Sequence, residues 1–217
     1  MVADLAGIER KAAKAINLGL AYGMGEAKLC HSLGLPTEWQ INERTGKTFE
    51  TAGPEGKELL ERYHMNTPFL KGLTDFAKNR AATAGQIRTI GGRLCRFAYW
   101  ESKNGGKEVY LDKAEAIEKL GDVRRAFTHK ALNRLIQGSA ADQTKEAMYQ
   151  CWQAGYLPLL QVHDELCFSV ETQAEVQEIK DIMENCIQLK VPSVVDAEVG
   201  PTWYDAKTDY REWQWSK

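Results

Sequence analysis

The segment that most narrows the possible folds of this chain is ERKAAKAINLGLAYG, residues 9–23, because side chains recur in it at intervals of four. Residues at i and i+4 share one face of an α-helix, so the segment predicts a helix with one continuous ridge. At a rise of about 1.5 Å per residue, the ridge is roughly 18 Å long. It consists of Arg10, Lys14, Leu18 and Tyr22.

The order of side-chain types along this ridge fits an extended nucleoside triphosphate. Arg10 and Lys14 can bind phosphate groups, while Leu18 and Tyr22 suit the sugar and the base. The segment therefore predicts a nucleotide-binding helix. An alanine-rich helix with basic residues is also typical of an exposed surface helix, and this alternative stays open.

A tight turn is predicted in PLLQVHDELCFSV, residues 158–170, because apolar stretches flank His163 and Asp164. The two stretches would form the strands of a hairpin, with Asp164 exposed between them. Glu165 is a second carboxylate, but consecutive strand residues point to opposite faces, so the two are poorly placed to chelate one ion. The alternatives are a turn aspartate bonded to its own backbone and a purely structural histidine.

A third candidate site lies in THKALNRLIQGSAADQTKEAM, residues 128–148, where His129, Asn133 and Gln137 are again spaced by four. Their ridge is polar but uncharged, and such groups both donate and accept hydrogen bonds. They suit the acceptors that every base pair presents in the minor groove, which permits sequence-independent contact with a duplex end. A ridge that is only solvated is the alternative.

In this order along the chain, the segments resemble DNA polymerase family A, the DNA polymerase I group, and specifically the C-terminal fingers and palm of a phage-like member. The helix at 9–23 resembles the finger helix R-x3-K-x3-[aromatic]-G-x2-Y-G, with Leu18 in place of the aromatic residue. Three further stretches are similar to the family's later motifs, and only about residues 37–62 fail to match. These stretches are GQIRTIGGRLCRF at 85–97, N-x3-Q-G-x-x-A-D within 133–142 and VHDE at 162–165.

The resemblance implies an α+β fold, in which a helical fingers subdomain accompanies an antiparallel palm sheet with packed helices. It further implies that residues 1–217 are the C-terminal part of a polymerase domain, with 37–62 as an insertion. Fingers would comprise mainly about 1–85 and 105–140, and palm mainly about 86–104 and 141–217.

The resemblance also implies roles for individual residues in DNA-directed DNA synthesis. Asp164 would be the catalytic ligand of two Mg²⁺ ions, with Glu165 as a secondary carboxylate. Lys14 would lie against the phosphates of the incoming dNTP and donate a proton to pyrophosphate, and Arg10, Leu18 and Tyr22 would complete the nucleotide site. The primer-template would be bound by His163 at the primer end and by His129, Asn133, Gln137, Arg88 and Arg93.

One family motif is not found in these residues. The first palm motif, D-Y-S-x-x-E-L-R, carries the other metal-binding aspartate and would precede the finger helix; Asp209–Tyr210–Arg211 is only a superficial echo of it. A two-metal site needs this second carboxylate. We therefore expect a second polypeptide that carries the upstream palm motif, as in a split enzyme, although gene fragmentation or an incomplete reading frame would give the same sequence. The alternative function is a catalytically inactive DNA- or nucleotide-binding fragment.

Charge and cysteine content indicate how strongly the chain binds DNA and in which cellular compartment it is expected. The net charge of −2 predicts weak, salt-dependent DNA binding by the chain alone. Residues 71–96 are locally basic, with Asp75 against Lys71, Lys78, Arg80, Arg88, Arg93 and Arg96. The five cysteines never form C-x-x-C, so a cytoplasmic protein without a disulfide framework or zinc site is expected. No run of about 18 apolar residues occurs, and no membrane association is expected.

Hydrophobic periodicity predicts the remaining elements. Helices are expected near 4–23, 25–33 and 172–188, and near 56–82 with a kink at Pro68. Residues 41–56 read as an insertion that forms a short hairpin or a flexible loop. Strands at about 86–90, 93–99, 157–162, 165–170 and 194–199 would form the antiparallel palm sheet.

Overall fold

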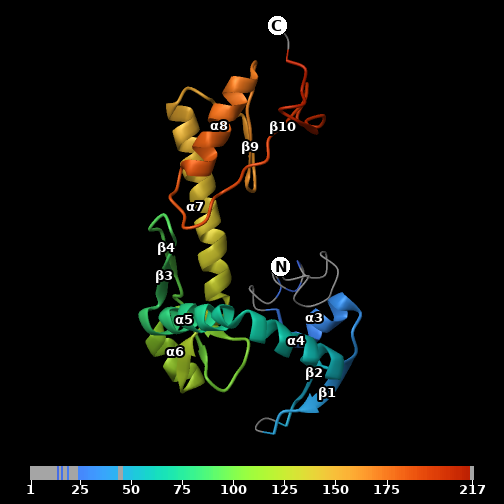
Figure 1. Ribbon diagram of the computed structural model, residues 1–217. Coiled ribbons are helices and arrows are strands. Elements are labelled where there is room, and N and C mark those ends of the chain that lie inside the picture. Colours follow the sequence, from blue (N-terminus) through green and yellow to red (C-terminus); the bar gives the residue numbers. More distant parts are fainter. Residues whose placement is uncertain (1–13, 15, 17–18, 20–23, 44–45, 216–217) are drawn as a thin grey trace. The chain divides into compact units, whose positions relative to one another are not determined.

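The computed structural model describes residues 14, 16, 19, 24–43 and 46–215 (Figure 1). Arg10, Leu18 and Tyr22 lie outside these residues, whereas Lys14, Ile16 and Gly19 are described and are helical. The chain divides into two compact units. The first comprises Met1–Arg88 and Leu94–Ile136, and the second comprises Thr89–Arg93 and Gln137–Lys217.

The first unit begins with a small helix and a hairpin. Helix α3 (Glu26–Leu33) ends at Gly34, whose φ of 69° is a left-handed conformation that glycine adopts without strain. Strands β1 (Thr37–Ile41) and β2 (Thr48–Ala52) pair antiparallel, with Thr37 opposite Ala52. Of the two alternatives expected for residues 41–56, the described residues show the hairpin, because β2 lies in this segment and pairs with β1.

Two helices follow where one kinked helix was expected. Helix α4 (Pro54–Asn66) ends before Thr67, and helix α5 (Pro68–Ala84) starts immediately after it. Thr67 has φ −132° and ψ 53°, outside the helical region, and its hydroxyl donates to the carbonyl of Tyr63 at 2.7 Å. Proline restricts the residue before it and has no N–H to continue the helix. The expectation of a kink at Pro68 was therefore wrong, because Pro68 begins a new helix.

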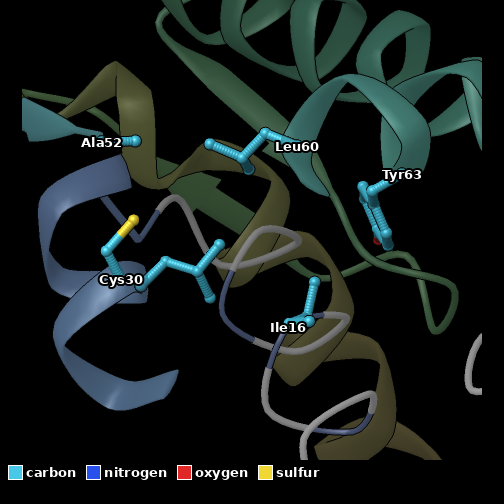
Figure 2. Close-up of a cluster of buried hydrophobic side chains, with 6 residues drawn as sticks. Ile16, Cys30, Ala52, Leu60 and Tyr63 are labelled. Atoms are coloured by element: carbon cyan, nitrogen blue, oxygen red, sulfur yellow. The ribbon is translucent and has the colours of Figure 1, made fainter. Parts of the chain in front are cut away.

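Two apolar clusters hold the first unit together. Gly56 of α4 lies so close to α3 that a Cβ there would be 2.4 Å from Sγ of Cys30. Figure 2 shows the first cluster, in which Ile16 packs with side chains of α3, β2 and α4, namely Leu29, Cys30, Ala52, Leu60 and Tyr63. The second cluster joins α5, β3, the loop after β4 and the start of α7, through Ala77, Ala81, Ile87, Phe97, Ala131 and Leu132.

The rest of the first unit is built of short strands. Strands β3 (Gln86–Arg88) and β4 (Leu94–Arg96) form a hairpin that was expected from the sequence. A three-stranded sheet that was not expected has β5 (Trp100–Ser102) between β6 (Val109–Tyr110) and β7 (Val123–Arg125). Helix α6 (Lys113–Leu120) connects β6 and β7, and the side chain of Asp112 caps its N-terminus.

The second unit is organised around a long helix. Helix α7 (Ala131–Gln153) starts in the first unit and continues into the second, where α8 (Gln173–Asn185) and the loop after it pack beside it (Figure 1). Gln143 Nε2 donates to Ser193 Oγ at 2.8 Å, and Gln150 Nε2 donates to the carbonyl of Cys186 at 3.2 Å. The predicted helix at 172–188 is confirmed, and Thr172 and Glu175 form a capping box at its start.

The strands of the second unit form separate pairs. β8 (Leu160–Val162) pairs with β9 (Glu165–Cys167), and β10 (Glu198–Val199) pairs with β11 (Thr208–Asp209). No sheet among the described residues has more than three strands. The fold is thus α+β with small antiparallel sheets, and the expected strands do not join into one sheet among the described residues. In the part of the chain that is described, no helix has both the length and the apolar character needed to cross a membrane.

Candidate functional site

The predicted hairpin turn is present, and it exposes a carboxylate. Val162 of β8 is paired with Glu165 of β9, which leaves His163 and Asp164 as a two-residue turn. His163 has φ 55°, a conformation that is costly for a residue other than glycine but is required at the first position of the tight turns that join twisted strands. The Gln161 side chain donates to the carbonyl of His163 and supports the strained turn.

Asp164 lies at the outer end of this turn and is exposed. No described residue donates a hydrogen bond to its carboxylate, so the arrangement differs from that of a turn aspartate bonded to its own backbone. Glu165 is also exposed, but it is the first residue of β9, whereas Asp164 lies in the turn, as expected from the sequence. The turn therefore presents one unpaired, solvated carboxylate with a second carboxylate beside it in sequence.

A single exposed aspartate fits one part of a Mg²⁺ site. Mg²⁺ commonly binds one or two carboxylates together with substrate phosphates and retains several waters. Across the described residues, no three His, Cys, Asp or Glu side chains gather into a metal-binding group. Asp164 can thus supply one ligand, and the described residues do not complete the site.

The polar ridge before and within α7 differs from the expected continuous α-helical ridge. Phe127 adopts a left-handed conformation with φ 60°, and residues Thr128–Lys130 form a 3-10 helix, η1, before α7 begins at Ala131. A 3-10 helix has about three residues per turn, so His129 is out of register with the α-helical positions that follow. Asn133 and Gln137 are one turn apart on α7, and His129 and Gln137 are both exposed.

Arg93, which was predicted as a DNA contact, meets residues of α7 at the tip of the β3–β4 hairpin, and no role was predicted for its partner Asp142. Arg93 Nε donates to Asp142 Oδ1 at 2.8 Å, and Arg93 Nη2 donates to the carbonyl of Gly138 at 2.9 Å. Burial raises the pKa of Asp142, but the nearby Thr89 hydroxyl and the Arg93 guanidinium outweigh this and hold that pKa below its ordinary value. Arg93, predicted as a DNA contact, therefore has a protein partner.

The other predicted basic contacts lie in the first unit. Lys14 is exposed on a helical segment, and Arg88 is exposed at the end of β3. The basic segment also includes exposed side chains on α5 and β4, namely Lys71, Lys78, Arg80 and Arg96. Arg10, Leu18 and Tyr22 of the predicted nucleotide site are outside the described residues, so the structure leaves the ridge of the finger helix as a prediction.

Comparisons with known proteins show the family to which the chain belongs. The model of a family described as DNA polymerase family A matches residues 2–205. A DNA-directed DNA polymerase of Pseudomonas phage M6 is 43% identical over 221 residues, which cover 94% of this chain and 30% of the phage protein. A thermostable DNA polymerase I of Thermus filiformis is 31% identical over 207 residues, which cover 92% of this chain and 21% of that protein.

A solved structure is similar over most of the chain. It is the POL domain of Pol1 from M. smegmatis in complex with DNA primer-template and dNTP, with a TM-score of 0.63 and 25% sequence identity. The match covers 88% of this chain and 31% of that one. The chain thus spans less than a third of the length of each of these relatives.

Proposed function

We propose that this chain, which belongs to DNA polymerase family A, forms the fingers and the C-terminal part of the palm of a DNA-directed DNA polymerase. The reaction is template-directed addition of a deoxynucleotide to a primer 3′-hydroxyl. The single observation that carries this proposal is Asp164, an exposed carboxylate without a described hydrogen-bond donor, held in a strained turn between β8 and β9. Strain retained at a polar turn is typical of functional sites.

The proposed work of the chain's own residues is to bind and orient the two substrates. Lys14 and Arg10 bind the triphosphate, and Lys14 donates a proton to the departing pyrophosphate. Leu18 and Tyr22 contact the sugar and the nascent base pair. Asp164 would hold Mg²⁺, and Glu165 would add negative charge beside it. Bound Mg²⁺ would supply activation of the 3′-hydroxyl and neutralisation of charge on the phosphates.

The proposed primer-template contacts come from polar side chains at the surface. His163 lies next to Asp164 in the same turn and would contact the primer end. Asn133 and Gln137, one turn apart on α7, would bind the minor-groove acceptors, together with His129. Arg88 would bind a template phosphate.

The second catalytic carboxylate is proposed to come from outside residues 1–217. The motif D-Y-S-x-x-E-L-R does not occur in this sequence, and the described residues contain no complete metal group. A polypeptide that carries this motif would then complete the palm. The second candidate function, an inactive DNA- or nucleotide-binding fragment, is favoured by the same observation.

Primer extension with Mg²⁺ and all four dNTPs tests the proposal. The chain is assayed alone and together with a polypeptide that carries the upstream palm motif, beside its Asp164→Asn variant. Asp196→Asn is the matched control, because Asp196 is another exposed aspartate of the second unit. Extension that is lost in Asp164→Asn and retained in Asp196→Asn is expected. Extension by Asp164→Asn at the unsubstituted rate would refute the metal role, and no extension under either condition would favour the binding fragment.

A further inference from the structure

The tip of the β3–β4 hairpin is fastened to α7 by several polar contacts, which we call the tip clamp. The clamp comprises Arg93, which donates to Asp142 Oδ1 at 2.8 Å and to the carbonyl of Gly138 at 2.9 Å. It also comprises the backbone N–H of Ile90, which donates to Ser139 Oγ at 3.1 Å. Within the tip, the backbone N–H of Thr89 donates to the carbonyl of Arg93 at 2.9 Å.

Two glycines let the tip and the helix approach closely. A Cβ on Gly138 would lie 2.8 Å from Thr89 Cγ2, and a Cβ on Gly91 would lie 2.9 Å from Asp142 Oδ2. Neither distance can be accommodated without displacement of a neighbour. Thr89 and Arg93 belong to the motif at 85–97, and Gly138 and Asp142 belong to the motif at 133–142. The two sequence motifs are therefore in direct contact at the hairpin tip.

Charge and burial oppose a phosphate contact by Arg93. The side chain of Asp142 is only 10% exposed, whereas that of Arg93 is 49% exposed. Asp142 Oδ2 is buried and has no hydrogen-bond partner among the described residues. If Arg93 moved to a phosphate, the carboxylate would lose its cationic partner in a mostly buried place, which is costly. Arg93 therefore neutralises Asp142 and is not available to DNA.

The clamp occupies one side of the α7 turn that carries Gln137. At about 100° per residue, the clamped positions Gly138, Ser139 and Asp142 fall within one arc of the helix. Gln137, Ala140 and Ala141 fall on the other side, and all three are exposed. The exposed side thus presents one amide between two methyl groups, a shape that allows a close approach to a groove.

We propose that Arg93 is a positioning residue, which fixes the rotation of this turn of α7 so that Gln137 faces the minor groove of the bound primer-template. The inference rests on the proposed function in one respect, the assignment of Gln137 as a minor-groove contact. It replaces the phosphate contact predicted for Arg93 from the sequence. The clamp itself, as a structural element, does not depend on DNA.

Binding to DNA with a single acceptor removed distinguishes the two roles of Arg93. Primer-templates with an ordinary purine or its 3-deaza analogue at the primer end are compared by fluorescence anisotropy at several salt concentrations. The analogue lacks the minor-groove N3 acceptor. The unsubstituted chain is expected to bind the analogue about 5- to 100-fold more weakly, the range of one good base contact. Gln137→Ala, Arg93→Ala and Asp142→Asn are each expected to weaken binding to ordinary DNA and to abolish discrimination against the analogue.

The phosphate-contact alternative predicts a different pattern. Arg93→Ala would then weaken binding to both DNAs equally and lower the salt slope by about one, whereas Asp142→Asn would free Arg93 and strengthen binding. Either result would overturn the proposal. Arg96→Ala is the control for the loss of one positive charge from this hairpin, because Arg96 is an exposed cation in β4.

Amide hydrogen exchange tests the clamp without DNA. The N–H of Ile90 is expected to exchange about tenfold faster or more in Arg93→Ala and in Asp142→Asn, since each variant removes a charge-assisted hydrogen bond. Unchanged exchange at Ile90 in both variants would overturn the clamp. If the unsubstituted chain binds no primer-template while Ile90 exchange rises as expected, the proposed function fails and the clamp stands.

Discussion

Replacement of Gly138 by alanine has two opposite effects on the free energy of unfolding: it raises the helix propensity of α7, and it adds a methyl group in a crowded place. Alanine in a helix interior is favoured over glycine by about 1 kcal/mol. The new Cβ, however, would lie 2.8 Å from Thr89 Cγ2, and Thr89 is only 6% exposed, so its methyl group cannot turn into solvent. Overpacking at such a site costs about 1–3 kcal/mol. We expect Gly138→Ala to leave the free energy of unfolding unchanged or to lower it by up to about 2 kcal/mol.

The matched control is Gly72→Ala on α5. Nothing lies within 4 Å of the position that a Cβ on Gly72 would take, so alanine there should stabilise its helix by up to about 1 kcal/mol. Urea unfolding followed by far-UV circular dichroism measures both variants, and hydrogen exchange of α5 and α7 amides separates the two units. The double variant Gly138→Ala/Thr89→Ser removes the opposing methyl group but keeps the hydroxyl, and it should recover the helix gain.

If Gly138→Ala stabilises α7 as much as Gly72→Ala stabilises α5, the hairpin tip does not approach α7 at Gly138. If Thr89→Ser has the same effect with Gly138 and with Ala at that position, Thr89 is not the residue that resists the new methyl group.

Three further predictions follow from burial, charge and exposed apolar surface. Leu60→Ala, at a side chain 6% exposed in the first cluster, should lower the free energy of unfolding of the first unit by about 2–5 kcal/mol in urea titrations. The pKa of Asp142 is lowered on folding, so its stabilising effect is present above its unfolded pKa of about 3.9 and is lost as pH falls through the folded value. In acid unfolding, the Asp142→Asn variant should lack the loss of stability that protonation of Asp142 causes. Phe69 and Phe76, which are 67% and 68% exposed on α5, should cause self-association, and Phe69→Lys/Phe76→Lys should reduce it in light scattering; equal association of the variant would contradict this.

Local pattern was sufficient for several elements because the physical cause is itself local. The Thr172–Glu175 capping box and the periodicity after it determine α8, and the apolar runs around His163 and Asp164 determine the β8–β9 turn. The position of Pro68 was identified correctly as a break, but whether a proline kinks one helix or separates two depends on the residue before it. Thr67 leaves the helical region here. Its position before Pro68 favours this conformation but does not by itself distinguish a kink from a break.

The sequence by itself determined which chemical groups this protein carries and their order, since motif spacing is a property of the chain alone. It could not determine which of those groups are free to meet a ligand. The sequence predicts Arg93 as a phosphate contact, yet Arg93 is bound to Asp142, forty-nine residues away. Gly91 and Gly138 leave room for the hairpin tip to approach α7 where this pair forms. The tertiary structure determines that Arg93 pairs with Asp142, because a buried carboxylate needs a cationic partner and the fold brings Arg93 within reach.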